Sequence, residues 1–248
     1  MSGHSKWSTI KRQKGAKDEK RGQIFTKLAR EITVAAKSGV PDPDSNFRLR
    51  IAVQKARSEN MPRDNIERAI ERAAGGAGAD NFDDVSYEGF GPGGVALVIQ
   101  ALTDNRNRTV GEVRSTLTRA GGTLGESGSV GWMFDSVGSI LVDRGESDPE
   151  ELALAAIDAG AQDVQIEDDG VEVFTEVQDL HIVQEALVAA GYEIRNAEPS
   201  MRPKTLMEVD EQTAIKTIRL LEKLEELDDV QQVYSNLDIT DDVLASVS

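Results

Sequence analysis

The chain has 248 residues, a formal net charge of −16 and no cysteine. Its hydrophobic content of 39% and charged content of 29% are typical of a folded globular protein and exclude a disordered chain. The lack of cysteine excludes disulfides and thiolate metal sites and fits a reducing compartment. No apolar run is long enough for a secretory signal or a membrane span. We therefore expect a cytoplasmic protein with no membrane partner.

Positive charge is concentrated at the N-terminal end. Residues 1–75 hold 17 basic and 9 acidic residues, whereas the other 173 residues hold 11 basic and 35 acidic ones. Such asymmetry indicates that the basic part has a polyanionic partner.

The first 21 residues carry seven basic side chains and show no sustained apolar period. They are interpreted either as a solvated tail or as an arm that lies along a phosphate backbone, with Trp7 available for stacking or anchoring. Basic side chains continue into the helices that follow, where a solvated helix face is the alternative for each one. The predicted nucleic-acid-binding residues are Lys6, Trp7, Lys11, Arg12, Lys14, Lys17, Lys20, Arg21, Lys27, Arg30, Arg48, Arg50, Lys55 and Arg57.

Three amphipathic helices are predicted within residues 1–78, because apolar residues recur there at helical spacing. The second helix is expected to be capped by Asp44 or Ser45. The third is expected to be capped by Asp64, with Glu67 as its capping-box partner. Short helices with tight connections bury their apolar faces best as an antiparallel bundle.

The glycine-rich segment 89–94 matches G-x-G-x-x-G formally, but its context excludes a dinucleotide site. It contains a proline and precedes an apolar strand at 95–99 rather than a helix. A hairpin turn is predicted instead.

A helix capped by Thr109, with Glu112 as capping-box partner, is predicted after this strand. Arginines gather around it, in a part of the chain otherwise poor in arginine. Local pairing with acidic neighbours is the first interpretation. A second contact patch is the alternative, formed by Arg106, Arg108, Arg114 and Arg119.

Residues 131–201 contain the complete element order β-α-β-β-α-β, which is that of the ferredoxin-like plait. The expected strands are 139–143, 164–166, 171–174 and 192–197, and the expected helices are 148–159 and 180–190.

A strand at 205–209, a helix at 211–227 and a strand at 230–235 form half of another such unit, whose other half lies at 95–120. The plait is therefore predicted to be inserted into a discontinuous domain. The fold class is α+β and multidomain: an N-terminal three-helix bundle followed by two ferredoxin-like α+β units, the second inserted in the first. The predicted domains are 1–78, 79–130 with 202–240, and 131–201.

Residues that could carry out catalysis are scarce. The only two histidines, His4 and His181, have no second histidine at ligand spacing, so no metal site is predicted. No Ser-His-Asp order, nucleophile elbow or phosphate loop is present. We expect a protein that is not an enzyme, with no cofactor and no small-molecule substrate.

Several motifs together resemble one family, the YebC/PmpR family of probable transcriptional regulatory proteins. The mitochondrial translational activator of cytochrome c oxidase subunit I is similar. The resemblance covers essentially the whole chain; Ser38-Gly39-Val40 departs from an expected Gly-Gly pair. The motifs are Gly3-His4-Ser5-Lys6-Trp7, Asp42-Pro43, residues 60–70 (NMPRDNIERAI), residues 87–94 (YEGFGPGG), residues 103–109 (TDNRNRT) and Gly121-Gly122-Thr123-Leu124-Gly125.

This resemblance implies a cytoplasmic, non-enzymatic protein of three domains with no catalytic residues to transfer. Family members are described as DNA-binding regulators of transcription, and others resemble ribosome-associated translation factors. We therefore expect a DNA-binding regulator that acts through its basic arm and bundle. The alternative is a translation factor that binds ribosomal RNA through the same unit, and a third is an interaction scaffold. Phosphate contacts do not distinguish DNA from RNA. The acidic domains are expected to stay clear of the polymer.

Overall fold

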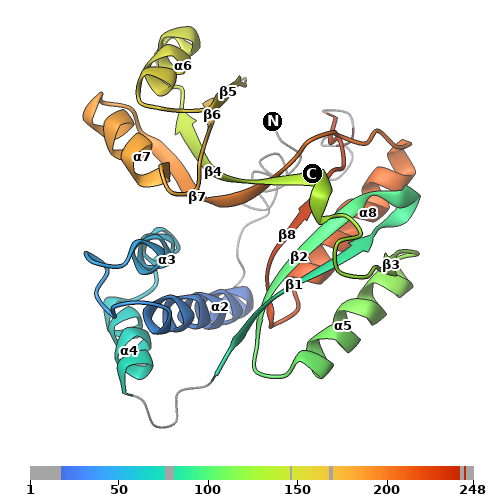
Figure 1. Cartoon of the computed structure of the whole chain (residues 1–248). Coiled ribbons are helices and arrows are strands. Elements are labelled where there is room, and N and C mark those ends of the chain that lie inside the picture. The colour runs from blue at the N-terminus through green and yellow to red at the C-terminus, as the bar shows by residue number, and fades with distance from the viewer. Residues whose placement is uncertain (1–17, 76–80, 146, 168–169, 241–242, 244–248) are drawn as a thin grey trace. The chain divides into compact units, whose positions relative to one another are not determined.

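The computed structural model describes residues 18–75, 81–145, 147–167, 170–240 and 243. The chain forms two compact units. One is Trp132–Leu206, and the other combines the described residues before Trp132 with those from Met207 onward. Both contain a four-stranded antiparallel sheet with helices, so the protein is of the mixed α+β class (Figure 1).

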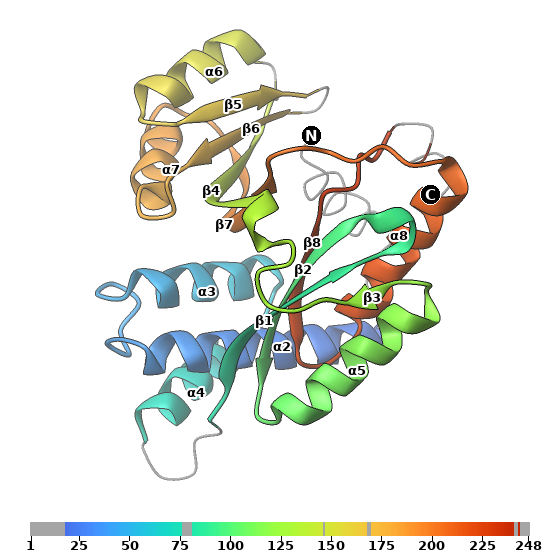
Figure 2. The ribbon, with the colours of Figure 1, turned by 45° about the vertical axis from the view of Figure 1, so that its right-hand side comes forward.

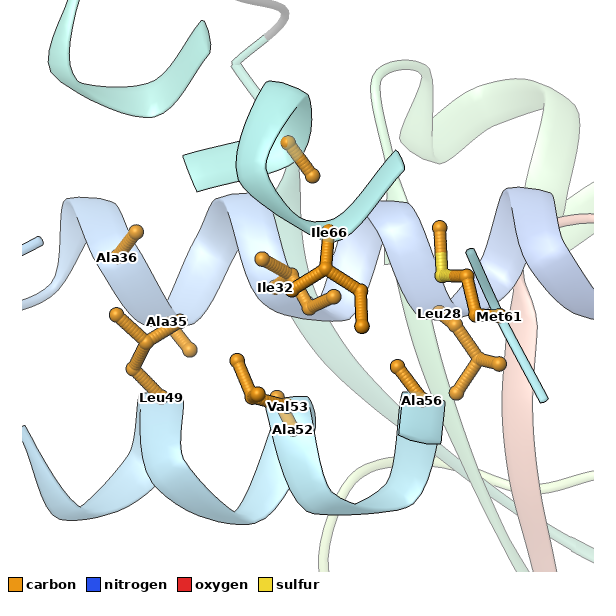
Figure 3. Packing of buried hydrophobic residues seen from close by; sticks show 11 residues of the cluster. Leu28, Ile32, Ala35, Ala36, Leu49, Ala52, Val53, Ala56, Met61 and Ile66 are labelled. Atoms are coloured by element: carbon orange, nitrogen blue, oxygen red, sulfur yellow. The ribbon is translucent and has the colours of Figure 1, made fainter. Parts of the chain in front are cut away.

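The described chain begins with three helices, α2 (Asp18–Lys37), α3 (Phe47–Ser58) and α4 (Arg63–Ala74). Figure 3 shows Leu28 of α2 toward Ala56 and Met61, and Ile32 of α2 toward Ile66 of α4, within one buried cluster. Leu28, Ile32, Val53 and Ile66 are all buried, as their helical spacing predicts. Burial of such side chains stabilises the bundle by about 1.5–3 kcal/mol each.

The predicted caps of α3 and α4 are wrong. The N-cap of α3 is Asn46, whose side chain accepts from Leu49 N and donates to the carbonyls of Ala35 and Val40. A buried amide that satisfies three backbone groups outcompetes the exposed Asp44 and Ser45 for this position. Helix α4 starts directly after Pro62, with no side-chain cap, because the fixed φ of proline already sets the helix entrance.

In the larger unit, the sheet order is β3-β1-β2-β8. The strands are β1 (Asp83–Phe90), β2 (Ala96–Thr103), β3 (Thr123–Leu124) and β8 (Val230–Ser235), and the helices are α5 (Arg106–Arg119) and α8 (Glu211–Glu225). The predicted hairpin turn is confirmed: β1 and β2 are antiparallel, and the short 3-10 helix η1 (Pro92–Gly94) joins them. Gly93 and Gly94 both have positive φ, which glycine adopts readily.

The predicted strand at residues 205–209 is wrong, since Met207 makes only an isolated bridge to Leu237. The position beside β2, on the side away from β8, is taken by β1, which pairs with β2 along all eight of its residues. The order of strands in the sheet is therefore the order found in a ferredoxin-like plait. The difference is that one of the two central strands, β1, comes before β2 in the sequence instead of directly before α8. A tight hairpin makes this local pairing far easier to form than one between distant segments.

The smaller unit has the element order predicted from the sequence. Its sheet order is β5-β6-β4-β7, with α6 and α7 packed on it (Figure 2). Buried Ile140, Val173 and Leu152 contribute to its core. The elements are the 3-10 helix η2 (Gly131–Met133) at its entrance, β4 (Phe134–Asp143), α6 (Pro149–Asp158), β5 (Asp163–Ile166), β6 (Gly170–Thr175), α7 (Leu180–Ala189) and β7 (Ile194–Pro203).

Candidate nucleic-acid interface

Most of the predicted arm precedes the first described residue. Lys6, Trp7, Lys11, Arg12, Lys14 and Lys17 lie outside the described residues, and Lys20 lies in the first turn of α2, where only the backbone is described. The first predicted contact with a described side chain is Arg21, which is exposed on α2.

Two predicted contact residues of α2 bind inside the protein. Lys27 Nζ donates to the carbonyl oxygens of Glu225 at 2.5 Å and Val230 at 2.6 Å. Arg30 Nη1 donates to the carbonyl of Asp228 at 2.8 Å and to Oδ1 of Asp229 at 2.9 Å. Carbonyls at the C-terminal end of α8 attract cations, because the helix dipole places partial negative charge there. These two side chains connect α2 to the α8–β8 turn.

The predicted residues of α3 also have intramolecular roles. Arg48 pairs with Asp84 of β1 at 2.6 Å, and Lys55 pairs with Glu31 of α2 at 3.4 Å. Arg50 donates to the carbonyls of the loop that precedes α3. Arg57, in the last turn of α3, is exposed and has no side-chain partner among the described residues.

Of the four arginines around α5, two form ion pairs and two have exposed side chains. Arg106 pairs with Asp83 at 2.7 Å, and Arg108 pairs with Asp104 at 2.7 Å, so the interpretation as local pairing with acidic neighbours applies to both. Arg114 and Arg119 are exposed, and neither has a side-chain partner in the described part of the chain.

Asp229, between α8 and β8, is the most highly connected carboxylate of this region. Its side chain is 2% exposed; Oδ2 accepts from Arg108 at 2.6 Å, Thr109 at 2.7 Å and Thr103 at 3.1 Å. Burial raises the pKa of Asp229, but the hydrogen bonds from Arg108, Thr109 and Thr103 and the charge of Arg108 outweigh it, so the pKa is below its ordinary value.

The predicted capping box of Thr109 and Glu112 is wrong because Thr109 binds Asp229 instead. Thr109 is fully buried, and its hydroxyl belongs to the Asp229 network. The N-cap of α5 lies four residues earlier, at Asn105, whose side chain accepts from Arg108 N.

Two cavities lie beside this network. The first, of about 470 Å³, is bounded by α2, α4, Phe82 and Asp104. The second, of about 520 Å³, shares Arg30 and Asp104 with the first. Its other lining includes Arg108 and four acidic residues, Glu112, Glu226, Asp228 and Asp229, so acidic residues outnumber basic ones there.

Sequence reasoning missed the residues of the first cavity. Arg68 and Arg72 of α4 line it together with Asn65 and Phe82. The spacing i, i+4 of the two arginines and their position in or beside the motif at 60–70 are the available signals. The density of basic residues falls after Arg57, so a prediction based on that density ends there.

Exposed cations also remain on α8. Lys216, Arg219 and Lys223 follow one another at steps of three and four, which puts them on one helix face. All three are exposed, and none has a side-chain partner among the residues described.

Two further features are absent from the described residues. No group of three or more His, Asp or Glu side chains there could hold a metal ion. No described helix is both long and apolar enough to cross a membrane. His181 lies 3.1 Å from Glu185, one turn further along α7.

Two family models match the chain. The model described as the TACO1/YebC protein N-terminal domain matches residues 5–76. The model described as the TACO1/YebC second and third domain matches residues 82–237.

Similar proteins cover the whole length. A protein of Herpetosiphon aurantiacus is 54% identical over 244 residues, which are 98% of this chain and 97% of that protein. One of Thermomicrobium roseum is 53% identical over 248 residues, which are 100% of both. Both carry the name "Probable transcriptional regulatory protein". The crystal structure of a conserved hypothetical protein from Aquifex aeolicus has a TM-score of 0.83 and 46% identity, covering 90% of this chain and 93% of that one.

Proposed function

The chain belongs to the TACO1/YebC family, and from this premise we propose that it is a cytoplasmic, non-enzymatic regulator of gene expression that binds nucleic acid, specifically a DNA-binding regulator of transcription. The names of the relatives support regulation. The charge distribution supports a polyanionic partner for the N-terminal part.

The proposal rests on one observation: many of the basic residues predicted to bind nucleic acid are bonded to groups within the protein. Among the described predicted contacts, Lys27, Arg30, Arg48 and Lys55 neutralise or hydrogen-bond groups of the protein itself. We therefore assign phosphate binding chiefly to the arm, whose charged members are Lys6, Lys11, Arg12, Lys14, Lys17, Lys20 and Arg21.

Binding of this kind depends strongly on salt, because each neutralised phosphate releases counterions. If the arm neutralises about six phosphates, the affinity for duplex DNA falls roughly a thousandfold between 50 and 200 mM salt. A flat salt response would contradict the proposal.

The experiment is the triple charge reversal Lys11→Glu, Arg12→Glu and Lys14→Glu in the full chain, assayed by fluorescence anisotropy with a labelled DNA duplex. The matched control reverses two lysines and one arginine on α8, namely Lys216, Arg219 and Lys223, which have no partner within the described part. The arm variant is expected to lose most of the affinity and the control variant little of it. Equal losses would show that net charge, and not the arm, governs binding.

The same assay with an RNA duplex tests the alternative, a ribosome-associated translation factor that binds ribosomal RNA. Phosphate contacts alone give no preference between the two polymers. A clear preference for RNA, together with cosedimentation of the protein with ribosomes, would replace the DNA assignment.

A further inference from the structure

We propose that the cavity beside α2 and α4 binds one unstacked nucleotide of a single strand. This inference rests on the proposed nucleic-acid function and narrows its partner to one that presents an unpaired base. The cavity volume of about 470 Å³ is within the range of small-ligand sites, about 300–1,000 Å³.

Several of the residues that line the cavity come from two separate motifs of the sequence. Met61, Asn65 and Arg68 come from the motif at 60–70, and Asp104 comes from the motif at 103–109. The fold thus brings two separate motifs of the sequence to one cavity. Most of the other residues of these motifs have a visible structural role: Asn105 caps α5, and Thr109 binds Asp229. Within the described part of the chain, the side chains of Asn65 and Arg68 bond only to each other and to the first turn of their own helix.

Arg30 and Phe82 form a cation–π pair in the wall of the cavity. The Arg30 guanidinium lies over the Phe82 ring, 5.3 Å from its centroid, and is hydrogen-bonded to Asp228 and Asp229. A planar cation that has a ring on one face and hydrogen bonds from one edge nitrogen is preorganised. Unpaired bases stack on aromatic rings and on guanidinium planes, and each such contact is worth about 1–3 kcal/mol.

The cavity is lined by apolar side chains on one part of its surface and by exposed arginines on another. Phe25, Ala29, Met61 and Ala69 supply apolar surface to the lining. Arg68 and Arg72 are exposed at successive turns of α4, and Arg72 has no side-chain partner among the described residues. A base in contact with the apolar side chains would place its phosphate within reach of these arginines, which bind phosphate with charge-assisted hydrogen bonds.

The neighbouring cavity provides an internal comparison. It has a similar volume but four carboxylates in its lining besides that of Asp104, whereas the first cavity has Asp104 alone, which is already paired with Arg108. Of the two, the first suits an anionic ligand.

The test is the double variant Arg68→Gln and Arg72→Gln in the full chain, with labelled oligoadenylate as RNA and as single-stranded DNA. We expect affinity for the single strands to fall at least about tenfold, because each lost charge-assisted contact costs roughly that factor. Affinity for a DNA duplex should change about threefold or less. The charge-matched control is Arg63→Gln with Arg144→Gln, two exposed arginines that do not line the cavity.

A second variant removes space and leaves the charge unchanged. Thr26 is exposed and lines the cavity, so Thr26→Trp should occupy it and reduce single-strand binding selectively while circular dichroism stays unchanged. Titration of the wild type with adenosine monophosphate should shift the amide resonances of Asn65 and Ala69, and the shifts should vanish in both variants. An additional contrast between RNA and DNA strands would show whether the 2′-hydroxyl is read.

The outcomes separate this inference from the function on which it rests. If the wild type binds duplex and single strands but the Arg68/Arg72 and Thr26 variants bind single strands equally well, the cavity assignment is overturned and the proposed function stands. If the wild type binds no nucleic acid at all, the proposed function fails.

Discussion

Arg30 in α2 donates from Nη1 to Oδ1 of Asp229, 2.9 Å away and 199 residues later in the chain. The Asp229 side chain is almost completely buried, and the same carboxylate receives Arg108. Asp229 is therefore one of the links between the N-terminal helices and the β3-β1-β2-β8 sheet, beside the hydrogen bonds of Lys27 and the Arg48–Asp84 pair. Lys27 and Arg30, which the sequence predicts to contact a partner, are hydrogen-bonded to groups of the protein itself.

Replacing Asp229 by Asn should destabilise the protein by about 3–5 kcal/mol, because two arginines and two threonine hydroxyls lose their charged acceptor. Urea denaturation followed by circular dichroism measures this change in the free energy of unfolding. The control is Asp84→Asn, which breaks an exposed pair with Arg48 and should cost less than about 1 kcal/mol. Equal costs would show that the Asp229 network contributes no more than a surface pair.

The stability supplied by Asp229 should depend on pH in one direction. Because the folded-state pKa of this carboxyl lies below its unfolded value of about 3.9, its contribution is present at neutral pH and is lost as pH falls through the folded pKa. The difference in unfolding free energy between the wild type and Asp229→Asn should therefore shrink between pH 6 and pH 3. A difference that stays constant over this range would contradict the assignment of the lowered pKa.

Glu88 of β1 should control the loop before η2. Its carboxylate accepts from the amides of Gly128, Val130 and Gly131 at 2.6–2.7 Å. Burial raises the pKa of Glu88, and these three backbone hydrogen bonds outweigh it, so the pKa is lowered. In Glu88→Gln, we expect hydrogen exchange at the three amides to accelerate by at least tenfold, with little change elsewhere. Glu126→Gln, at an exposed position of the same loop, is the control and should leave their exchange rates unchanged.

Two glycines offer a pair of opposite predictions. A Cβ on Gly122 would lie 2.4 Å from the carbonyl oxygen of Phe90, so Gly122→Ala should destabilise the protein by about 1–3 kcal/mol. Gly111 lies inside α5, and a Cβ added there would meet nothing within 4 Å, so Gly111→Ala should stabilise by about 0.5–1 kcal/mol. Thermal unfolding of both variants measures the two signs, and a stabilised Gly122→Ala protein would contradict the close approach of the two backbones.

Periodicity in the sequence predicted the elements of this fold well where each one is organised locally. The spacing of Leu28 and Ile32 gave the buried face of α2, and the element order of residues 132–206 followed from alternating apolar segments and turns. The prediction of a strand at 205–209 is wrong because an apolar run in the sequence does not show whether the position beside β2 in the sheet is already occupied by another strand. That position belongs to β1, which lies more than a hundred residues earlier.

The candidate site was less accessible to sequence reasoning. Asn46 displaced Asp44 and Ser45 because its amide also bonds to the carbonyls of Ala35 and Val40. Asn105 caps α5 in place of Thr109, whose hydroxyl binds Asp229, 120 residues later in the chain. Lys27 and Arg30 look like exposed helix cations until α8 is placed beside them. The cavity is formed by segments that lie far apart in the sequence, so only the fold reveals that Arg68 and Phe82 line a common space.

The ends of the Trp132–Leu206 unit are paired with each other: Phe134 opposes Pro203 in the β4–β7 ladder, and Lys204 N donates to the carbonyl of Met133. Opposed residues of antiparallel strands have their Cα atoms about 4.5–5.5 Å apart. When β4 and β7 are paired, the two ends of the segment between β3 and α8 are therefore held close together, as they would be by a short turn. The roughly seventy residues of the unit then add little to the entropic cost of closing this loop in the larger unit. We therefore expect that a short glycine linker can replace residues 132–206 without unfolding the larger unit.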